Sequence, residues 1–252
     1  MINVVSVRDM RIGEGIPKVI VPIADRAQER IIKKALSFSG MSMDAVEWRV
    51  DFYDDVFDTA KVLETAKLLR GVMPDMPLLF TFRTKAEGGE KDISMAAYTS
   101  LNKAIAQSGT VDLIDVEIFS GDEVVRENIT NIHEAGVYAV ASNHDFVKTP
   151  ARDELVKRLR KMQDMGADIL KIAVMPNSVE DVLTLLSATN EMYVKYANRP
   201  LITISMSPKG VISRLAGETF GSSMTFGSIG QTSAPGQVSV EKLSTILNIL
   251  HE

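Results

Sequence analysis

The sequence predicts an α/β protein, in its simplest form a (β/α)8 TIM barrel, and two observations carry this prediction. From residue 18 onward, short runs rich in β-branched residues alternate with longer segments of helical period, which is the pattern of parallel strands joined by helices. The alternation repeats eight times, and a chain of 252 residues is long enough for one such barrel. We therefore expect a single barrel domain over residues 1–252.

Eight segments meet the criteria for buried parallel strands. They are Val19 to Ala24, Ala45 to Phe52, Leu78 to Thr84, Leu113 to Phe119, Tyr138 to His144, Ile169 to Met175, Leu201 to Ser207, and Met224 to Ile229. An open, doubly wound sheet shows the same alternation of strands and helices. No GxGxxG stretch follows the first expected strand, however, which weighs against a dinucleotide-binding fold.

Helix boundary signals stand between the strands. Thr149 as N-cap, Pro150 at the first helical position and Gly166 just past the end delimit one helix. The next helix opens at Ser178. Its apolar stripe is expected to comprise Val182, Leu185, Leu186, Thr189, Tyr193 and Tyr196.

A short N-terminal segment precedes the first barrel strand. Residues 3–17 contain three valines followed by Gly13-Glu14-Gly15, and we predict a β-hairpin that caps the barrel floor, with the glycines in its turn. A phosphate-binding loop is the less favoured alternative, because no helix start follows these glycines.

Composition excludes several classes of function. The chain has no cysteine, so disulfides and thiolate catalysis are excluded, and its three dispersed histidines lack the spacing of a metal site. The net charge of −5 comes from scattered charges without a basic stripe, which argues against nucleic acid as a partner. No apolar run approaches the ~20 residues of a membrane span, and the first residues do not resemble a secretory signal. We expect a cytoplasmic protein without a membrane partner.

Several charged side chains are predicted to point into the barrel. Side chains on a strand alternate between its faces, and the apolar positions of residues 46–51 leave Glu47, Arg49 and Asp51 facing inward. The same rule turns four more charged residues inward: Arg83, Asp115, Glu117 and Lys171. Buried charges require partners, so we expect these groups to pair and to surround a polar substrate. A network that only fixes strand register is the alternative.

Lys171 is the most informative single residue. It lies in the run Ile169 to Met175, among groups that do not solvate an ammonium, and burial favours the neutral amine. A neutral amine at pH 7 attacks ketones and forms a Schiff base. The alternative is a structural lysine paired with Glu117 or Glu47.

A Schiff base acidifies the neighbouring C–H bond, so the site also needs a base. His144 ends the fifth strand, and an imidazole takes up and returns a proton near neutral pH. His133 and His251 look inert by comparison, because one lies in a helical segment and the other is the penultimate residue. Glu87 could orient His144 through its ring N–H, although a solvated loop carboxylate explains the spacing equally well.

Residues late in the chain suggest where an anionic substrate group binds. The segment 227–237 is rich in small residues and could close as a lid, with Ser233 and Gln237 as hydrogen-bonding groups. Barrels often bind phosphate at this position, so a phosphosugar site stays open. Arg214 is placed to hold a carboxylate in a bidentate manner, the alternative being a helix-surface arginine.

Seven stretches, taken in order along essentially the whole chain, resemble type I 3-dehydroquinate dehydratases of the shikimate pathway. They are Glu47-Trp48-Arg49-Val50-Asp51, Leu79-Phe80-Thr81-Phe82-Arg83, Glu87-Gly88-Gly89-Glu90, Ser142-Asn143-His144-Asp145-Phe146, Lys171-Ile172-Ala173-Val174-Met175-Pro176, Ser213-Arg214-Leu215-Ala216-Gly217 and Ser233-Ala234-Pro235-Gly236-Gln237. Each stretch alone is a weak signal. Their order along the chain makes the resemblance specific.

The resemblance implies a cofactor-free lyase that dehydrates 3-dehydroquinate to 3-dehydroshikimate on a homodimeric barrel. By position, it implies that Lys171 forms the imine, His144 is the acid and base, and Glu87 orients His144. The residues implied to bind substrate are Glu47, Arg49, Arg83, Arg214, Ser233 and Gln237. One departure is Ile204, which stands in Ile204-Ser205-Met206 where the family often has methionine, and this leaves the local packing open.

Two other functions remain compatible with the residues alone. A class I aldolase uses a barrel lysine in the same way but cleaves C–C bonds, commonly in sugars or sugar phosphates. A non-catalytic barrel that binds a small acid would form no covalent adduct on Lys171.

Overall fold

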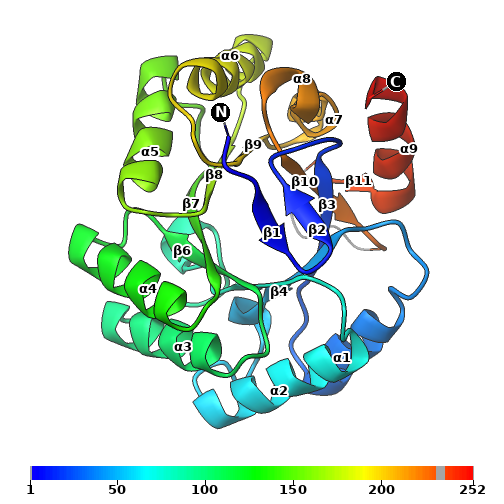
Figure 1. Ribbon diagram of the computed structural model, residues 1–252, viewed down its shortest axis with the longest axis vertical. Coiled ribbons are helices and arrows are strands. Elements are labelled where there is room, and N and C mark those ends of the chain that lie inside the picture. Colours follow the sequence, from blue (N-terminus) through cyan, green and yellow to red (C-terminus); the bar gives the residue numbers. More distant parts are fainter. Residues whose placement is uncertain (1, 231–235, 252) are drawn as a thin grey trace.

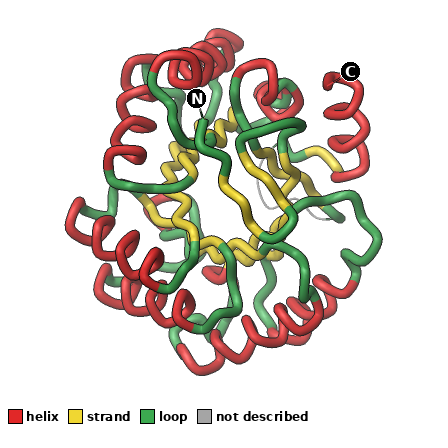
Figure 2. The backbone as a smooth tube through the Cα atoms, viewed as in Figure 1, coloured by secondary structure: helices red, strands yellow, loops and turns green. Residues whose placement is uncertain are grey.

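The computed structural model describes residues 2–230 and 236–251, and its centre is a curled parallel sheet that forms a barrel (Figure 2). Following the sheet order, the barrel strands are β3 (Lys18–Ile23), β4 (Ala45–Arg49), β5 (Leu78–Thr81), β6 (Leu113–Glu117), β7 (Tyr138–Asp145), β8 (Ile169–Val174), β9 (Leu201–Ser205) and β10 (Met224–Ser228). The Ser223 amide donates to the Leu201 carbonyl at 2.7 Å, which joins β9 to the start of β10 and closes the ring. A short strand, β11 (Val238–Ser239), pairs in parallel with the end of β10.

Helices surround the ring of strands on the outside (Figure 1). They are α1 (Gln28–Leu36), α2 (Thr59–Val72), α3 (Met95–Gln107), α4 (Asp122–Glu134), α5 (Arg152–Asp164), α6 (Val179–Lys195), α7 (Ile212–Leu215), α8 (Gly217–Phe220) and α9 (Val240–His251). Outward-facing strand residues such as Trp48, Phe80 and Leu170 are buried between strands and helices. Within the described residues, no helix combines the length and apolar character needed to cross a membrane.

The predicted N-terminal hairpin is confirmed, and it lies across one end of the barrel (Figure 1). It consists of β1 (Val5–Val7) and β2 (Met10–Ile12), paired antiparallel with Val5 opposite Ile12. Its buried side chains pack against the inward residues at the amino ends of the barrel strands, among them Ile20, Leu79, Val140 and Ile202. This end of the barrel is therefore filled with apolar side chains.

The predicted position of the hairpin turn is wrong. The turn lies at Arg8 and Asp9, whereas Gly13 and Gly15 follow β2. Arg8 adopts a φ of 52°, an uncommon conformation for a residue with a side chain. Its guanidinium donates to Asp112 at 2.9 Å, and this contact holds the turn against the barrel.

Three further predictions of local structure need correction. The second barrel strand, β4, ends at Arg49, and the chain continues as a 3-10 helix, η1 (Val50–Phe52), instead of remaining a strand to residue 52. Helix α5 begins after Ala151, while the Thr149 hydroxyl donates to the Met175 carbonyl at 3.0 Å instead of capping the helix. Of the expected apolar stripe, Tyr193 on α6 and Tyr196, which follows the helix, are exposed. The Ser178 start of α6 is confirmed by a capping box with Asp181.

Candidate active site

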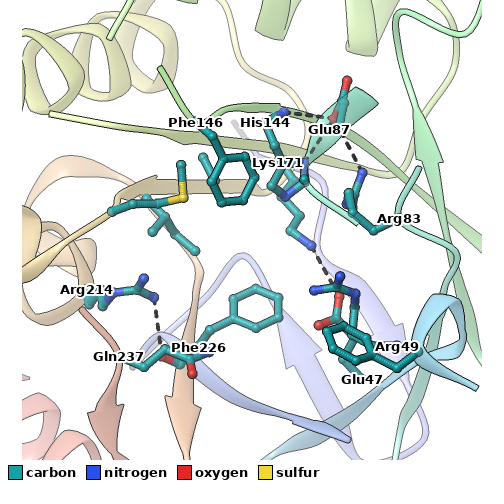
Figure 3. A pocket seen from close by; sticks show the side chains of 15 residues that line it. Glu47, Arg49, Arg83, Glu87, His144, Phe146, Lys171, Arg214, Phe226 and Gln237 are labelled. Carbon is teal, nitrogen blue, oxygen red and sulfur yellow. Dashed lines mark hydrogen bonds and ion pairs between the residues drawn. The ribbon is translucent and has the colours of Figure 1, made fainter. Parts of the chain in front are cut away.

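A cavity of about 700 Å³, including its open mouth, lies at the carboxyl ends of the barrel strands (Figure 3). It is lined by Glu47, Arg49, Phe52, Arg83, Glu87, Gly88, His144, Phe146, Lys171, Ala173, Ile204, Met206, Arg214, Phe226 and Gln237. In this architecture the carboxyl end of the strands is where substrates bind. Among the described residues predicted for the site, all line this one cavity. Ser233 lies outside the described residues.

Arg83 is the centre of a buried charge network. Its Nη1 donates to Glu117 Oε1 at 2.8 Å, and its Nη2 lies 2.9 Å from Asp115 Oδ1. Glu117 is held further by the amide and hydroxyl of Thr84 at 2.8 and 2.7 Å. Burial alone would lower the pKa of Arg83, but Asp115 and Glu117 raise it above the ordinary arginine value. The arginine therefore stays charged next to the cavity.

Arg49 is fixed by a bidentate ion pair with Asp51. The two guanidinium–carboxylate distances are both 2.8 Å, and the Asp51 side chain is fully buried on η1. Burial lowers the pKa of Arg49, and the contact with Asp51 outweighs it. Strand alternation predicted that both charges would face the barrel interior, but Asp51 lies beyond the strand, and it is the turn into η1 that brings its carboxylate alongside the guanidinium.

Lys171 reaches the cavity from the middle of β8, and its side chain is almost fully buried. Its Nζ lies 3.3 Å from Asp115 Oδ2, 3.4 Å from Glu47 Oε1, and 4.7 Å from the centre of the Phe226 ring. The residues of its own strand predicted apolar surroundings for the amine. The surroundings are instead partly charged, because carboxylates approach from β4 and β6. Its contact with Glu47 is present, whereas Glu117 is occupied by Arg83.

His144 and Glu87 contact each other directly, so Glu87 is not a solvated loop carboxylate (Figure 3). Glu87 Oε2 lies 3.0 Å from His144 Nδ1 and accepts the His144 backbone N–H at 2.8 Å. Asn143 donates to the other carboxylate oxygen at 3.1 Å. In a neutral imidazole with its proton on Nδ1, the Nδ1–H group donates a hydrogen bond to Glu87. Nε2 is then the basic nitrogen.

Burial changes the protonation of this pair. The pKa of His144 falls well below 6.5, first because of burial and then because Arg83 and Lys171 lie nearby. Burial raises the pKa of Glu87 to about 7, against the opposing effect of Arg83. At neutral pH the imidazole is therefore uncharged and able to accept a proton. Glu87 is the group of the pair that titrates near neutrality.

Two glycines fix the segment that carries Glu87. Gly88 has a φ of 85°, which ends the 3-10 helix η2 (Lys85–Glu87) in a left-handed conformation. A Cβ on Gly89 would lie 1.9 Å from the Arg83 carbonyl oxygen, so only glycine permits this approach of the two backbones. The tight turn explains how Glu87 reaches His144 from the end of β5.

Arg214 and Gln237 line the part of the cavity that faces His144 and Glu87 from across the barrel (Figure 3). Arg214 is almost fully buried on α7, which contradicts the alternative of a helix-surface arginine. Burial lowers its pKa to about 10, so the guanidinium remains charged at neutral pH. The pair is suited to binding an anionic group of a substrate.

Several apolar residues of the cavity were not predicted from the sequence. Phe52, Phe146, Ala173, Met206 and Phe226 line it together with Ile204, the position that departs from the family pattern. Phe226 was within reach of the alternation rule, because it lies two residues after the inward Met224 on β10. Phe146 gave no such signal, since it lies in a loop after β7.

The positions of the acidic and histidine side chains determine whether the protein can hold a metal ion. In the ranges 2–230 and 236–251, no group of three His, Cys, Asp or Glu side chains is arranged to hold a metal ion. The carboxylates of the site are instead engaged by Arg49, Arg83, Lys171 and hydrogen-bond donors.

Comparison with known proteins identifies the family. Residues 19–252 match the type I 3-dehydroquinases. The chain belongs to this family. It is 53% identical over 248 residues to a 3-dehydroquinate dehydratase of Clostridioides difficile strain 630, covering 98% of this chain and 97% of that relative. A 3-dehydroquinate dehydratase of Escherichia coli O139:H28 is also 53% identical, with 98% of both chains covered.

Solved structures agree with the assignment to the type I 3-dehydroquinases. A type I 3-dehydroquinate dehydratase from Clostridium difficile, solved with covalently modified comenic acid, superposes with a TM-score of 0.97 at 52% identity and covers 100% of this chain and 99% of its own. A 3-dehydroquinate dehydratase from Geobacillus kaustophilus gives a TM-score of 0.95 at 38% identity, covering 98% and 96%. The predicted barrel with an N-terminal hairpin and the predicted hydro-lyase family are confirmed, and the class I aldolase is set aside.

Proposed function

We propose that this type I 3-dehydroquinase dehydrates 3-dehydroquinate to 3-dehydroshikimate through an imine on Lys171. What supports the proposal is one juxtaposition: Lys171 lines the same cavity as the hydrogen-bonded pair of His144 and Glu87. An amine that forms an iminium and a neutral imidazole that accepts a proton are the two groups required to activate a C–H bond next to a ketone.

The proposed reaction begins with the substrate ketone. Lys171 Nζ attacks the carbonyl carbon, the carbonyl oxygen leaves as water, and an iminium forms. His144 Nε2 then removes the C2 proton, and the C–H electron pair moves toward the iminium to give an enamine. The enamine expels the C1 hydroxyl, which takes the proton from His144 and leaves as water. Hydrolysis of the resulting conjugated iminium releases product and restores Lys171, so the net change is the loss of one water molecule.

Substrate binding divides between two sides of the cavity in this proposal. Arg214 and Gln237 hold the substrate carboxylate, together with Ser233 as the resemblance implies. On the other side, Glu47, Arg49 and Arg83 meet the ring hydroxyls. Their charges are already fixed by ion pairs within the protein, so little reorganisation is needed when substrate binds.

The activity is tested by mixing the purified protein with 3-dehydroquinate and following ultraviolet absorbance. We expect a new absorbance from the conjugated enone carboxylate of the product, without any added metal or cofactor. A protein that only binds the acid leaves the spectrum unchanged. An aldolase would instead release smaller fragments, which mass spectrometry of the reaction mixture distinguishes.

Glu87→Gln is expected to change the pH dependence of the reaction. Below its pKa of about 7, Glu87 is protonated and no longer presents an anion to the His144 ring, so kcat/KM of the wild type falls as the pH drops through that value. Glutamine does not titrate and is uncharged. We therefore expect kcat to fall by roughly tenfold to a hundredfold and the acid limb near neutrality to disappear. A variant that retains the wild-type limb contradicts this role.

The proposal also includes the cellular setting. We infer a cytoplasmic homodimer that acts in the shikimate pathway for aromatic amino acid biosynthesis. Light scattering of the purified chain measures the oligomeric state independently of activity.

A further inference from the structure

Asp115 is a buried charged residue that the proposed steps leave without a role. It lies on β6, faces the barrel axis, and has no exposed surface. It is not among the described residues that line the cavity, so it is not placed to contact substrate. An ionised carboxylate at such a depth is costly unless positive partners offset its burial.

Its two oxygens have different partners. Oδ1 accepts a hydrogen bond from the Ser142 hydroxyl at 2.6 Å and lies 2.9 Å from Arg83 Nη2. Oδ2 lies 3.3 Å from Lys171 Nζ. One oxygen is thus fixed by two neighbours, while the other faces the amine.

Glu47 also contacts the amine, at 3.4 Å, but its situation differs (Figure 3). Glu47 lines the cavity, where bound substrate reaches it, whereas Asp115 is fully buried and is not one of the described lining residues. Burial raises the pKa of Asp115, but Arg83 and Lys171 outweigh this effect and hold the pKa below its ordinary value. Asp115 is therefore an anion at neutral pH, in a place that substrate does not occupy.

We propose that Asp115 is the fixed counter-ion of the positive charge on Lys171 Nζ, in the free enzyme and in the iminium. The inference rests on the proposed imine route. An ammonium and a ketone combine to give an iminium and water, so Nζ carries one positive charge before and after this step. A carboxylate already oriented toward Nζ stabilises both cations without moving. Asp115 is thus a positioning residue, and its effect is exerted through Lys171.

The test is the pH profile of Asp115→Asn, measured on the full chain by kcat/KM and by borohydride trapping of the substrate adduct on Lys171. Loss of the anion favours the neutral forms of both cations, so the alkaline limb of the profile moves to lower pH, by about one unit or more, while the acid limb assigned to Glu87 stays near neutrality. At about pH 8 the trapped fraction falls by about tenfold. A merely structural role would lower the signal at every pH and leave the shape of the profile unchanged.

Two further variants make the result decisive. Asp168→Asn is the matched control, because this buried carboxylate lies before β8 and is held by His133 and the Ala139 amide, 2.8 and 2.9 Å away. Its pH profile stays that of the wild type. Ser142→Ala keeps the charge of Asp115 but removes the hydrogen bond that fixes Oδ1, so Oδ2 is held less firmly toward Lys171 Nζ and a smaller shift in the same direction is expected. This variant decides the question if Asp115→Asn does not fold.

The outcomes separate the two proposals. Adduct formation by the wild type, with unshifted profiles in Asp115→Asn and Ser142→Ala, overturns the counter-ion while the imine route stands. Absence of an adduct in the wild type overturns the proposed function, and the counter-ion with it.

Discussion

Lys171→Ala is expected to abolish the borohydride-trapped adduct and to lower kcat by a factor on the order of 10⁴ or more. No other described lysine lines the cavity, so alanine removes the nucleophile without a substitute. The cavity gains space and the two carboxylates lose a cation, but Asp115 keeps Arg83 as a partner at 2.9 Å. The measurement is intact-protein mass after reduction with 3-dehydroquinate, together with steady-state rates.

Controls separate the loss of the amine from damage to the fold. Lys171→Met retains a long side chain without an amine, and it should be as inactive as alanine. Lys209→Ala removes an exposed lysine whose Nζ donates to the Asn177 carbonyl at 2.7 Å, and it should keep wild-type rates. Retained turnover in a folded Lys171→Ala protein would discard the imine route.

His144→Ala is expected to separate the two halves of the reaction. Lys171 stays in place, so the covalent adduct still forms, but the C2 proton has no base and kcat falls by about 10²- to 10⁴-fold. Mass spectrometry after borohydride reduction should show the adduct of the undehydrated substrate. Steady-state assays should show little product.

A second histidine serves as the matched control for this variant. His133 lies on α4 and contacts Asp168 at 2.8 Å, away from the cavity. His133→Ala should therefore keep the wild-type rate, although it removes the same side chain. Equal losses in both variants, or an unaffected rate in His144→Ala, would remove His144 from its proposed role.

Strand periodicity predicted most of the site because a parallel barrel converts alternation along the chain into direction in space. The apolar residues Val46, Trp48 and Val50 face the helices, which predicts that Glu47 and Arg49 face the barrel axis. The structure places both charged residues at the cavity. The order of the strands then determines that these residues share a cavity with Lys171.

Features that depend on contacts between distant segments were harder to predict. The chain next to Lys171 is apolar, yet its amine meets carboxylates from β4 and β6, whose approach depends on the register and tilt of the whole barrel. The hairpin turn at Arg8 replaced the expected glycine turn because a tertiary contact with Asp112 supports a left-handed residue. Neither the carboxylates near Lys171 nor the contact of Arg8 with Asp112 can be predicted from the spacing of residues in the sequence.

The apolar packing of the N-terminal hairpin has a consequence for turnover. Since Val5, Val7 and Ile12 block the amino-terminal end of the barrel, 3-dehydroquinate arrives, and product and the one water molecule lost in each turnover depart, through the mouth beside Phe146 and Arg214. Entry and exit share one passage. A product molecule that lingers there obstructs the next substrate, so release of 3-dehydroshikimate and capture of 3-dehydroquinate must alternate in time.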